Sequence, residues 1–449
     1  MLAPAPRTSL ADTAAPPHPI LEELLIDTEA NRQPPPRPTP AATPGRAVLL
    51  GLSVVLIAFN LRPVFSSLSV TLPEIMVASG LSPTGASLLT TLPVLCLGLF
   101  APLAPWLGRR LGLERALLGC MALIVLGTLA RGSGSVALLF IASAIAGIGI
   151  AINNVLVTVL IKRDFPRRAA LVMGLYTMAV CGGAAAAAGM TVPLEQALGG
   201  GWTRALALWA VPAAIVTLLW APQALPLKPS ASESGMTVPG LWRDPLAWQV
   251  MLFMGLQSAL AYIVMGWLAP MLRERGMGAA AAGYVLSLCV MTQVVACLVA
   301  PLIAVRCRNQ VGIAVAVALL AVTALLACLF APLSGVWVWA ALLGLALGGA
   351  FALALTLIVL RSPDAHVAAQ LSGMAQGGGY LVAACGPLLV GLLRGWTGSF
   401  HASAYLIVLI GAALVASALG AGRARYVRAV AIPRMPGNSS SKPPQTVTG

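Results

Sequence analysis

Long apolar segments with almost no charged residues constrain this chain more than any other feature of its sequence. A helix needs about 20 apolar residues to cross the hydrocarbon core of a bilayer. Twelve segments come close to this length: residues 47–72, 84–107, 116–131, 136–161, 169–194, 202–222, 245–270, 279–303, 310–331, 335–360, 367–393 and 400–422. Gly, Pro or charged residues separate them, as in GRRLGLER and RSPDAH. The pattern predicts an all-α integral membrane protein with twelve transmembrane helices.

Composition excludes a soluble protein of this size. Apolar residues make up 59% of the chain, charged residues only 9%, and the mean hydropathy is +0.91. A soluble domain carries about 25% charged residues, and most of its polar surface is drawn from them. This chain has too few charged residues to cover such a surface, so we expect the lipid bilayer to surround most of it.

The basic residues predict the orientation of the helices. The net charge is +14 and the pI is about 10, a balance that also occurs in nucleic-acid-binding proteins. With both termini in the cytoplasm, the cytoplasmic segments hold 21 of the 27 basic residues and the outer loops hold five, while Arg62 lies inside a span. This asymmetry follows the positive-inside rule. Basic residues clustered with exposed aromatics are not seen, so no nucleic-acid partner is expected.

The chain divides into two similar halves. The polar stretch KPSASESGMTVPGLWRDP separates six spans from six. Identical or similar residues recur at an offset of 199 (Gly149 and Gly348, Gly174 and Gly373, Lys162 and Arg361, Ala169 and Ala368) or 197 (Pro73 and Pro270, Asn60 and Gln257). Chance recurrence in Gly- and Ala-rich helices is the alternative. Two parallel six-helix copies are the arrangement of major facilitator transporters, in which the solute path lies between the halves.

These boundaries predict five parts. They are a disordered cytoplasmic tail at 1–46, a six-helix half at 47–222, a cytoplasmic linker at 223–244, a second six-helix half at 245–422 and a cytoplasmic tail at 423–449. Small residues, as in CGGAAAAAG at 181–189, are typical of helices that pack closely in lipid.

Arg62 is the ionisable residue that lies deep in a span, within AFNLRPVF. A central arginine costs at least about 2.5–3.5 kcal/mol on insertion scales, so it is expected to bind a partner or a ligand. Pro63 cannot donate a backbone hydrogen bond to the carbonyl of Phe59, which predicts a helix kink. Asn60, Arg62 and Pro63 therefore indicate a solute site. The alternative is an arginine that is satisfied by neighbouring helices and serves only to hold them together.

Neutral polar residues in other spans are candidates to line the same path. They are Asn153, Asn154, Tyr176, Thr177, Gln257, Tyr262, Gln293, Gln376 and Tyr380, and we expect all but Thr177 and Gln293 to bind substrate. Gln376 and Tyr380 are four residues apart and share a helix face. Hydrogen bonding between helices is the alternative for each residue. With Arg62, this set suits a small anion or a polar heteroaromatic and does not suit a cation.

Groups for enzymatic chemistry are not found in the sequence. None of the 13 acidic residues lies deep in a span, and His18, His366 and His401 are peripheral, so an obvious proton relay is missing. Coupling through protonation of the solute itself or through Glu74 remains open. The eight cysteines form no CxxC pair, and no nucleophile elbow, phosphate loop or zinc spacing occurs. We predict a protein that is not an enzyme and uses no cofactor and no metal.

Several runs resemble the cyanate transporter and nitroimidazole transporter family of the major facilitator superfamily. They are FNLRPVFSSLSVTLPEI, TTLPVLCLGLFAPLAP, VLIKRDFPRRAALVMGLYT, GLQSALAYIVMGWLAP and LSGMAQGGGYLVAACGPLLVGLL, and the resemblance covers residues 47–422. It implies a bacterial inner-membrane porter and places the Asn-x-Arg-Pro motif of the family on Asn60, Arg62 and Pro63. One departure is Arg109, which stands where the superfamily usually has an Asp after the second helix.

The sequence therefore predicts a secondary transporter that works as a monomer on a small-molecule solute, by alternating access. We expect a small anion, cyanate-like, or a small polar nitrogen-containing organic solute. An exporter of drug-like heteroaromatic compounds such as nitroimidazoles is the alternative transporter. A membrane receptor or enzyme is the rival class, and it would need a large extramembrane domain or catalytic acids and histidines near one face.

Overall fold

The computed structural model describes residues 44–199, 201–224, 236–237, 240–429 and 432–433. By its contacts the chain divides into two compact units, Met1–Leu50 and Gly51–Gly449. These units differ from the two six-helix halves, because the second unit contains nearly all of both halves. Residues 44–50 are the described part of the first unit, and they begin helix α2. Most of the tail predicted at 1–46, the linker residues 225–235 and 238–239, and the end of the tail predicted at 423–449 lie outside the described residues.

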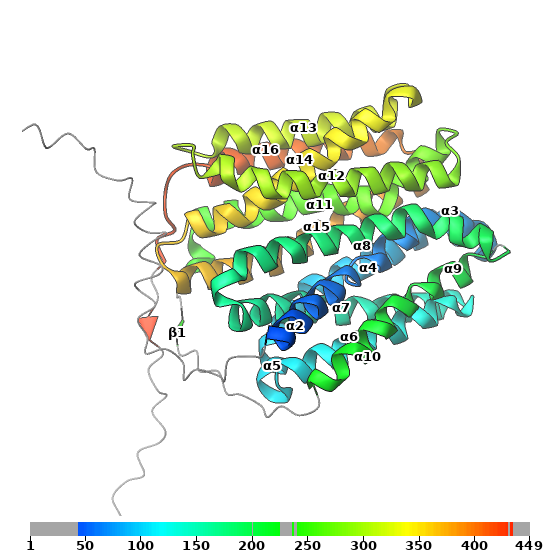
Figure 1. Ribbon diagram of the computed structural model, residues 1–449. Helices are drawn as coiled ribbons and strands as arrows, with labels where there is room; N and C mark the ends of the chain where they lie inside the picture. Colours follow the sequence, from blue (N-terminus) through cyan, green and yellow to red (C-terminus); the bar gives the residue numbers. More distant parts are fainter. Residues whose placement is uncertain (1–43, 200, 225–235, 238–239, 430–431, 434–449) are drawn as a thin grey trace, which may run out of the picture. The chain divides into compact units, whose positions relative to one another are not determined.

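The first six spans are built from nine α-helices with short 3₁₀ turns between some of them (Figure 1). These helices are α2 (Pro44–Phe59), α3 (Pro63–Ser79), α4 (Pro83–Phe100), α5 (Ala104–Leu111), α6 (Leu113–Ala130), α7 (Val136–Asp164), α8 (Ala169–Ala197), α9 (Trp202–Leu208) and α10 (Ala210–Ala224), with α5 continuing the second span after the turn η1 (Ala101–Leu103). The turn η2 (Arg131–Ser133) follows α6. The first and sixth spans are broken helices, α2 with α3 and α9 with α10.

The last six spans are each one continuous helix. They are α11 (Pro245–Glu274), α12 (Ala279–Ala304), α13 (Val311–Phe330), α14 (Val336–Leu360), α15 (Ala365–Thr397) and α16 (His401–Ala421). Two-residue strands β1 (Met236–Thr237) and β2 (Ile432–Pro433) pair antiparallel, with Met236 opposite Pro433. This pairing joins the end of the linker to the chain that follows α16.

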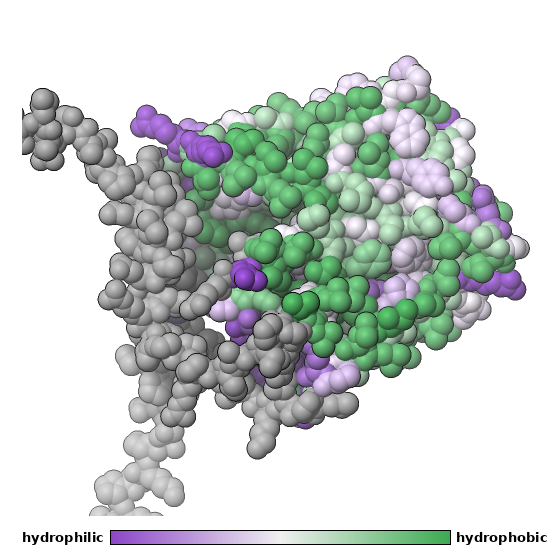
Figure 2. Space-filling model, in the orientation of Figure 1, coloured by the Kyte–Doolittle hydropathy of each residue, from purple (hydrophilic) through white to green (hydrophobic). Residues whose placement is uncertain are grey.

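The twelve predicted transmembrane helices are confirmed. Within the described residues, twelve helical segments are long and apolar enough to cross a membrane. Large apolar side chains such as Leu218 and Val338 are exposed, as lipid-facing residues should be. Figure 2 shows hydrophobic residues over the middle of the visible face and hydrophilic residues toward the two ends of the helices.

Some spans extend beyond the predicted ends. The first was expected to end at residue 72, but it runs from Val48 to Ser79. Pro73 lies inside α3 and does not end it. Prolines are tolerated in membrane helices where neighbouring groups satisfy the freed backbone. Glu74 therefore lies within a helix and not in a loop.

Local signals set several helix ends. Ser82 accepts a hydrogen bond from the Gly85 amide at 3.1 Å, and Asp244 accepts one from the Leu246 amide at 2.7 Å. Both are N-cap contacts that satisfy free amides of the first turn. Gly80 ends α3 with φ of 65°, a left-handed conformation that glycine adopts without strain.

Three helix pairs make the most extensive contacts between the two halves: α4 with α15, α8 with α12 and α3 with α11. Glycines allow close approach in these pairs. A Cβ at Gly283 of α12 would contact the carbonyl oxygen of Ala188 in α8. Close backbone approach of this kind is the main source of packing energy between helices in lipid.

Charged side chains also link helix ends within each half. Arg163, at the end of α7, pairs with Glu114 of α6 at 2.5 Å and with Asp164 at 2.7 Å. In the second half, Arg361 donates to the carbonyl of Ala421 at 2.8 Å and ties the end of α14 to the end of α16.

Candidate functional site

The first span is interrupted near its middle, between α2 and α3. The amides of Asn60 and Leu61 bond to the carbonyls of Ile57 and Ala58 at 3.0 and 3.1 Å, so the chain tightens into a three-residue turn. Pro63 begins α3 without an amide donor. The Asn60 side chain donates to the carbonyl of Leu56 at 2.9 Å and so satisfies backbone at the break.

Arg62 lies in this break and reaches across to the seventh span. Its Nη1 donates to the Tyr262 hydroxyl at 3.0 Å and lies 3.8 Å from the Met265 sulfur. Its guanidinium carbon lies 5.7 Å from the ring centre of Phe65 and 5.4 Å from that of Tyr262. These distances are within the range of cation–π attraction. Tyr380 of α15 packs edge-on against Tyr262, with ring centres 6.3 Å apart.

The charge of Arg62 has no acidic partner among the described residues. A guanidinium stays protonated in proteins, so the positive charge persists at this depth. Tyr176 and Tyr380 lie near enough to interact with it electrostatically. Within the described chain, its hydrogen bonds to Tyr262 and Met265 both use Nη1.

The site lies where equivalent positions of the two halves meet. Phe65 and Tyr262 are separated by the repeat offset of 197 residues, and their ring centres are 5.8 Å apart. Ser69 and Gly266 have the same offset, and the Ser69 hydroxyl donates to the Gly266 carbonyl at 3.0 Å. Contacts between equivalent positions place the crossing of α3 and α11 on the pseudo-twofold axis that relates the two halves. The counterpart of Arg62 is Ala259, so only the first half supplies a charge here.

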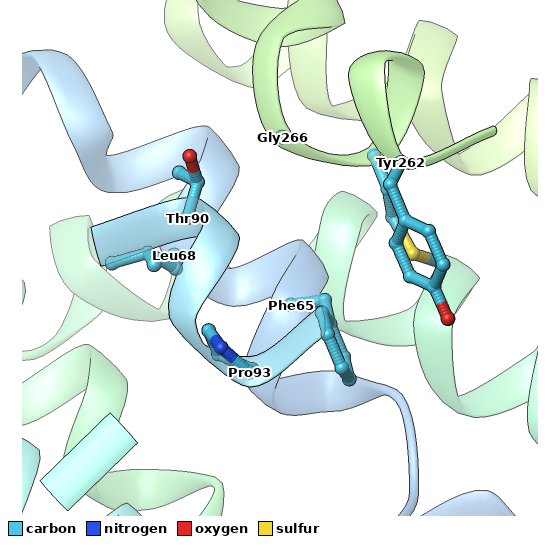
Figure 3. A pocket seen from close by; sticks show the side chains of 7 residues that line it. Phe65, Leu68, Thr90, Pro93, Tyr262 and Gly266 are labelled. Carbon is cyan, nitrogen blue, oxygen red and sulfur yellow. The ribbon is translucent and has the colours of Figure 1, made fainter. Parts of the chain in front are cut away.

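A pocket adjoins Arg62 at this crossing (Figure 3). The cavity itself is small, about 10 Å³, which is roughly the room of one water molecule, and it is partly open. It is lined by Phe65, Leu68, Thr90, Pro93, Tyr262, Met265 and Gly266, from the first, second and seventh spans. In Figure 3, the rings of Phe65 and Tyr262 project from different helices. The lining is mainly apolar and aromatic, with a few polar groups, as is typical of small-molecule sites.

The structure brings only some of the predicted site residues to Arg62. Tyr262, Tyr380 and Tyr176 surround it, and the Tyr176 hydroxyl donates to Asn154 at 3.0 Å. Gln376 bonds to Ser372 in its own helix at 2.7 Å.

Two other predicted residues are buried. Gln257 bonds to the carbonyl of Met254 and to Ser258, all within α11. Asn153 is fully buried, and its side-chain amide has no hydrogen-bond partner among the described residues.

Sequence reasoning missed Phe65 and Met265. Both are apolar residues in apolar spans, and their types alone carry no functional signal. The repeat could have identified Phe65, because the same offset that relates Asn60 to Gln257 relates Phe65 to Tyr262. Among the described residues, no group of three His, Cys, Asp or Glu side chains could hold a metal.

Twelve spanning helices in two similar halves, with a crossing of the first and seventh spans between them, are the architecture of a membrane transporter. Residues 50–372 match the sequence profile of the Major Facilitator Superfamily, and the chain belongs to that superfamily. Its relatives confirm the predicted branch, that of the cyanate and nitroimidazole transporters.

The relatives match over most of their length. The chain is 37% identical to the 2-nitroimidazole transporter of Escherichia coli (strain K12), over 85% of this chain and 97% of that protein. It is 31% identical to the cyanate transport protein CynX of the same organism, over 78% of this chain and 91% of that protein. It is 39% identical to the uncharacterized transporter YycB of Bacillus subtilis (strain 168), over 83% of this chain and 93% of that protein.

Solved transporters share the fold. A bacterial homologue of the human lysosomal transporter Spinster, in an inward-facing and unoccupied conformation, superimposes with a TM-score of 0.67. The match covers 86% of this chain and 99% of that one, at 18% sequence identity.

Proposed function

We propose that the protein is a secondary active transporter that moves a small anion, or a small polar nitrogen-containing solute, across the bacterial inner membrane. The observation that supports this best is the unpaired charge of Arg62 at the pseudo-twofold axis. A positive charge at that depth attracts an anion or a strongly dipolar group. Alternating access then carries the bound solute across by rocking one half against the other.

The orientation follows from the charge asymmetry of the loops. Both termini face the cytoplasm, and the connections at 80–82, 275–278 and 398–400 face the opposite side. The protein functions as a monomer, because one chain supplies both halves of the path.

Export of drug-like heteroaromatic compounds is the second candidate function, and the aromatic rings near Arg62 favour it. Phe65, Tyr262 and Tyr380 present three rings beside Arg62. Rings of this kind stack on a planar solute, while the guanidinium binds a nitro or carboxylate group. A linear anion such as cyanate would use the charge but little of the aromatic surface.

Substitution of Arg62 tests the proposal. A thermal-shift screen of small anions and heteroaromatics on the purified protein identifies a ligand, and uptake into proteoliposomes tests its transport. For that ligand, Arg62→Gln should abolish binding while the protein stays folded. Arg62→Lys keeps the charge but loses the planar fork of donors, so affinity should fall sharply if the contact is bidentate.

The same samples separate recognition from helix packing. An arginine that only ties helices together would lower the melting temperature and leave the solute affinity of the surviving protein unchanged. Retained affinity in Arg62→Gln, measured on protein with a reduced melting temperature, would reject the solute site.

A further inference from the structure

One ion pair joins the two halves on the side of the connections 80–82, 275–278 and 398–400, which we call the far side. Arg273, in the last turn of α11, lies 2.6 Å from one carboxylate oxygen of Glu74 in α3 and 2.7 Å from the other. The same Nη1 also lies 3.4 Å from the carbonyl of Val70. The two side chains are 23% and 29% exposed, so the pair is partly shielded from solvent.

The other far-side ion pair has a different place in the fold. Arg394 of α15 pairs with Glu274 of α11 at 2.9 Å, and both helices belong to the second half. Arg273 and Glu274 are neighbours in sequence, yet one binds across the interface and the other binds within a half. Of the ion pairs between described residues, Glu74–Arg273 is the one that crosses between halves.

Tight backbone packing also joins the two halves on the far side. Gly391 of α15 faces α4, and a Cβ there would contact Ser87 and would lie 2.7 Å from the Trp267 ring. In the contact between α8 and α12, Gly283 of α12 faces the carbonyl of Ala188 in α8. The two halves therefore meet closely on this side, and the ion pair is part of that closure.

The pair lies outside the proposed solute site. Glu74 follows Arg62 by 12 residues, which is roughly 18 Å along a helix. A rocking motion that opens the far side must separate α3 from α11, and with them Glu74 from Arg273. The solute at Arg62 would contact neither residue.

We propose that Glu74 and Arg273 form the latch that closes the far side, and that this pair breaks when the solute site opens to that side. The proposal rests on the alternating-access function proposed above. The latch biases the two-state equilibrium of the halves toward the closed far side, because the ion pair forms only there. Glu274 and Arg394 move together within one half and have no such effect.

Thiol labelling in sealed proteoliposomes tests the latch without a known solute. A cysteine at Thr90→Cys, on the pocket lining, reports access when a membrane-impermeant maleimide is added on the far side. The protein without this cysteine gives the background from the native cysteines. Glu74→Gln and Arg273→Gln should each increase the labelling rate several-fold, and Glu274→Gln, the matched control, should leave it unchanged.

A charge exchange completes the test. Glu74→Arg combined with Arg273→Glu should return the labelling rate toward that of the parent, because the pair is restored with opposite polarity. Equal increases in Glu74→Gln and Glu274→Gln would overturn the latch, as would unchanged labelling in Glu74→Gln and Arg273→Gln protein that melts normally. Since labelling needs no solute, failure here with intact uptake rejects the latch and leaves the proposed transport function standing.

Discussion

Arg131 shows how much the surroundings of a single residue can differ from its place in the sequence. The loop position suggests an exposed charge, but the residue is fully buried in η2 between α6 and α7. Its three guanidinium nitrogens have no hydrogen-bond partner among the described residues. The next residue, Gly132, lies against Ala207 and the carbonyl of Thr203. Helix α9 thus closes over a charge that costs free energy to bury.

Arg131→Met should therefore stabilise the protein. Methionine keeps most of the length and apolar contact of the side chain and removes the buried ion. Replacing a buried ion pair with apolar residues stabilises known proteins by up to about 4 kcal/mol, and the Arg131 charge has no partner among the described residues to offset its burial. We expect a higher melting temperature in detergent. Arg204→Met is the control, because Arg204 is exposed and should show little change. A lower melting temperature for Arg131→Met alone would mean that the guanidinium binds a group that stabilises it.

At the scale of elements, the break in the first span depends on a glycine of the fifth. A Cβ at Gly183 of α8 would overlap the carbonyl oxygen of Phe59, the last residue of α2. This is the carbonyl that Pro63 leaves without its usual helical donor. The neighbouring Gly182 has no atom within 4 Å of its Cβ position. The two adjacent glycines thus differ in role.

Gly183→Ala should destabilise the protein by about 1–3 kcal/mol, the usual cost of overpacking. The added methyl group must push α8 away from the break that holds Arg62. Gly182→Ala should be neutral or stabilising by up to about 1 kcal/mol, because alanine favours a helix and meets no neighbour. Unfolding of both variants in detergent measures the difference. Equal melting temperatures for the two variants would contradict this assignment.

At the scale of the whole molecule, the predicted orientation can be tested directly. Positive-inside asymmetry puts Ser133 outside the cytoplasm and Ser232 inside it. Ser133 lies in η2, and Ser232 lies outside the described residues. Reporter fusions that are active only in the cytoplasm should be inactive at Ser133 and active at Ser232. Equal activity at both positions would reject the twelve-span topology in this orientation.

The sequence by itself determined the number of spans, the two-half organisation and the depth of Arg62 in the first span. Hydropathy acts over one helix length, so the twelve spans can be counted without tertiary contacts. The cost of a charge at depth also depends mainly on its position along one helix. The predicted break at Pro63 is likewise local, since it follows from a missing amide donor.

Only the tertiary structure decided which side chains meet. Tyr262 reaches Arg62 from 200 residues away, whereas Gln257, five residues earlier on the same helix, bonds within α11. Arg273 and Glu274 are adjacent but pair in different directions. These outcomes depend on how each helix is rotated about its axis and on how the halves cross. In lipid, apolar residues face both the neighbouring helices and the bilayer, so the hydrophobic pattern does not specify how each helix is rotated. Close packing of small residues between helices specifies that rotation instead.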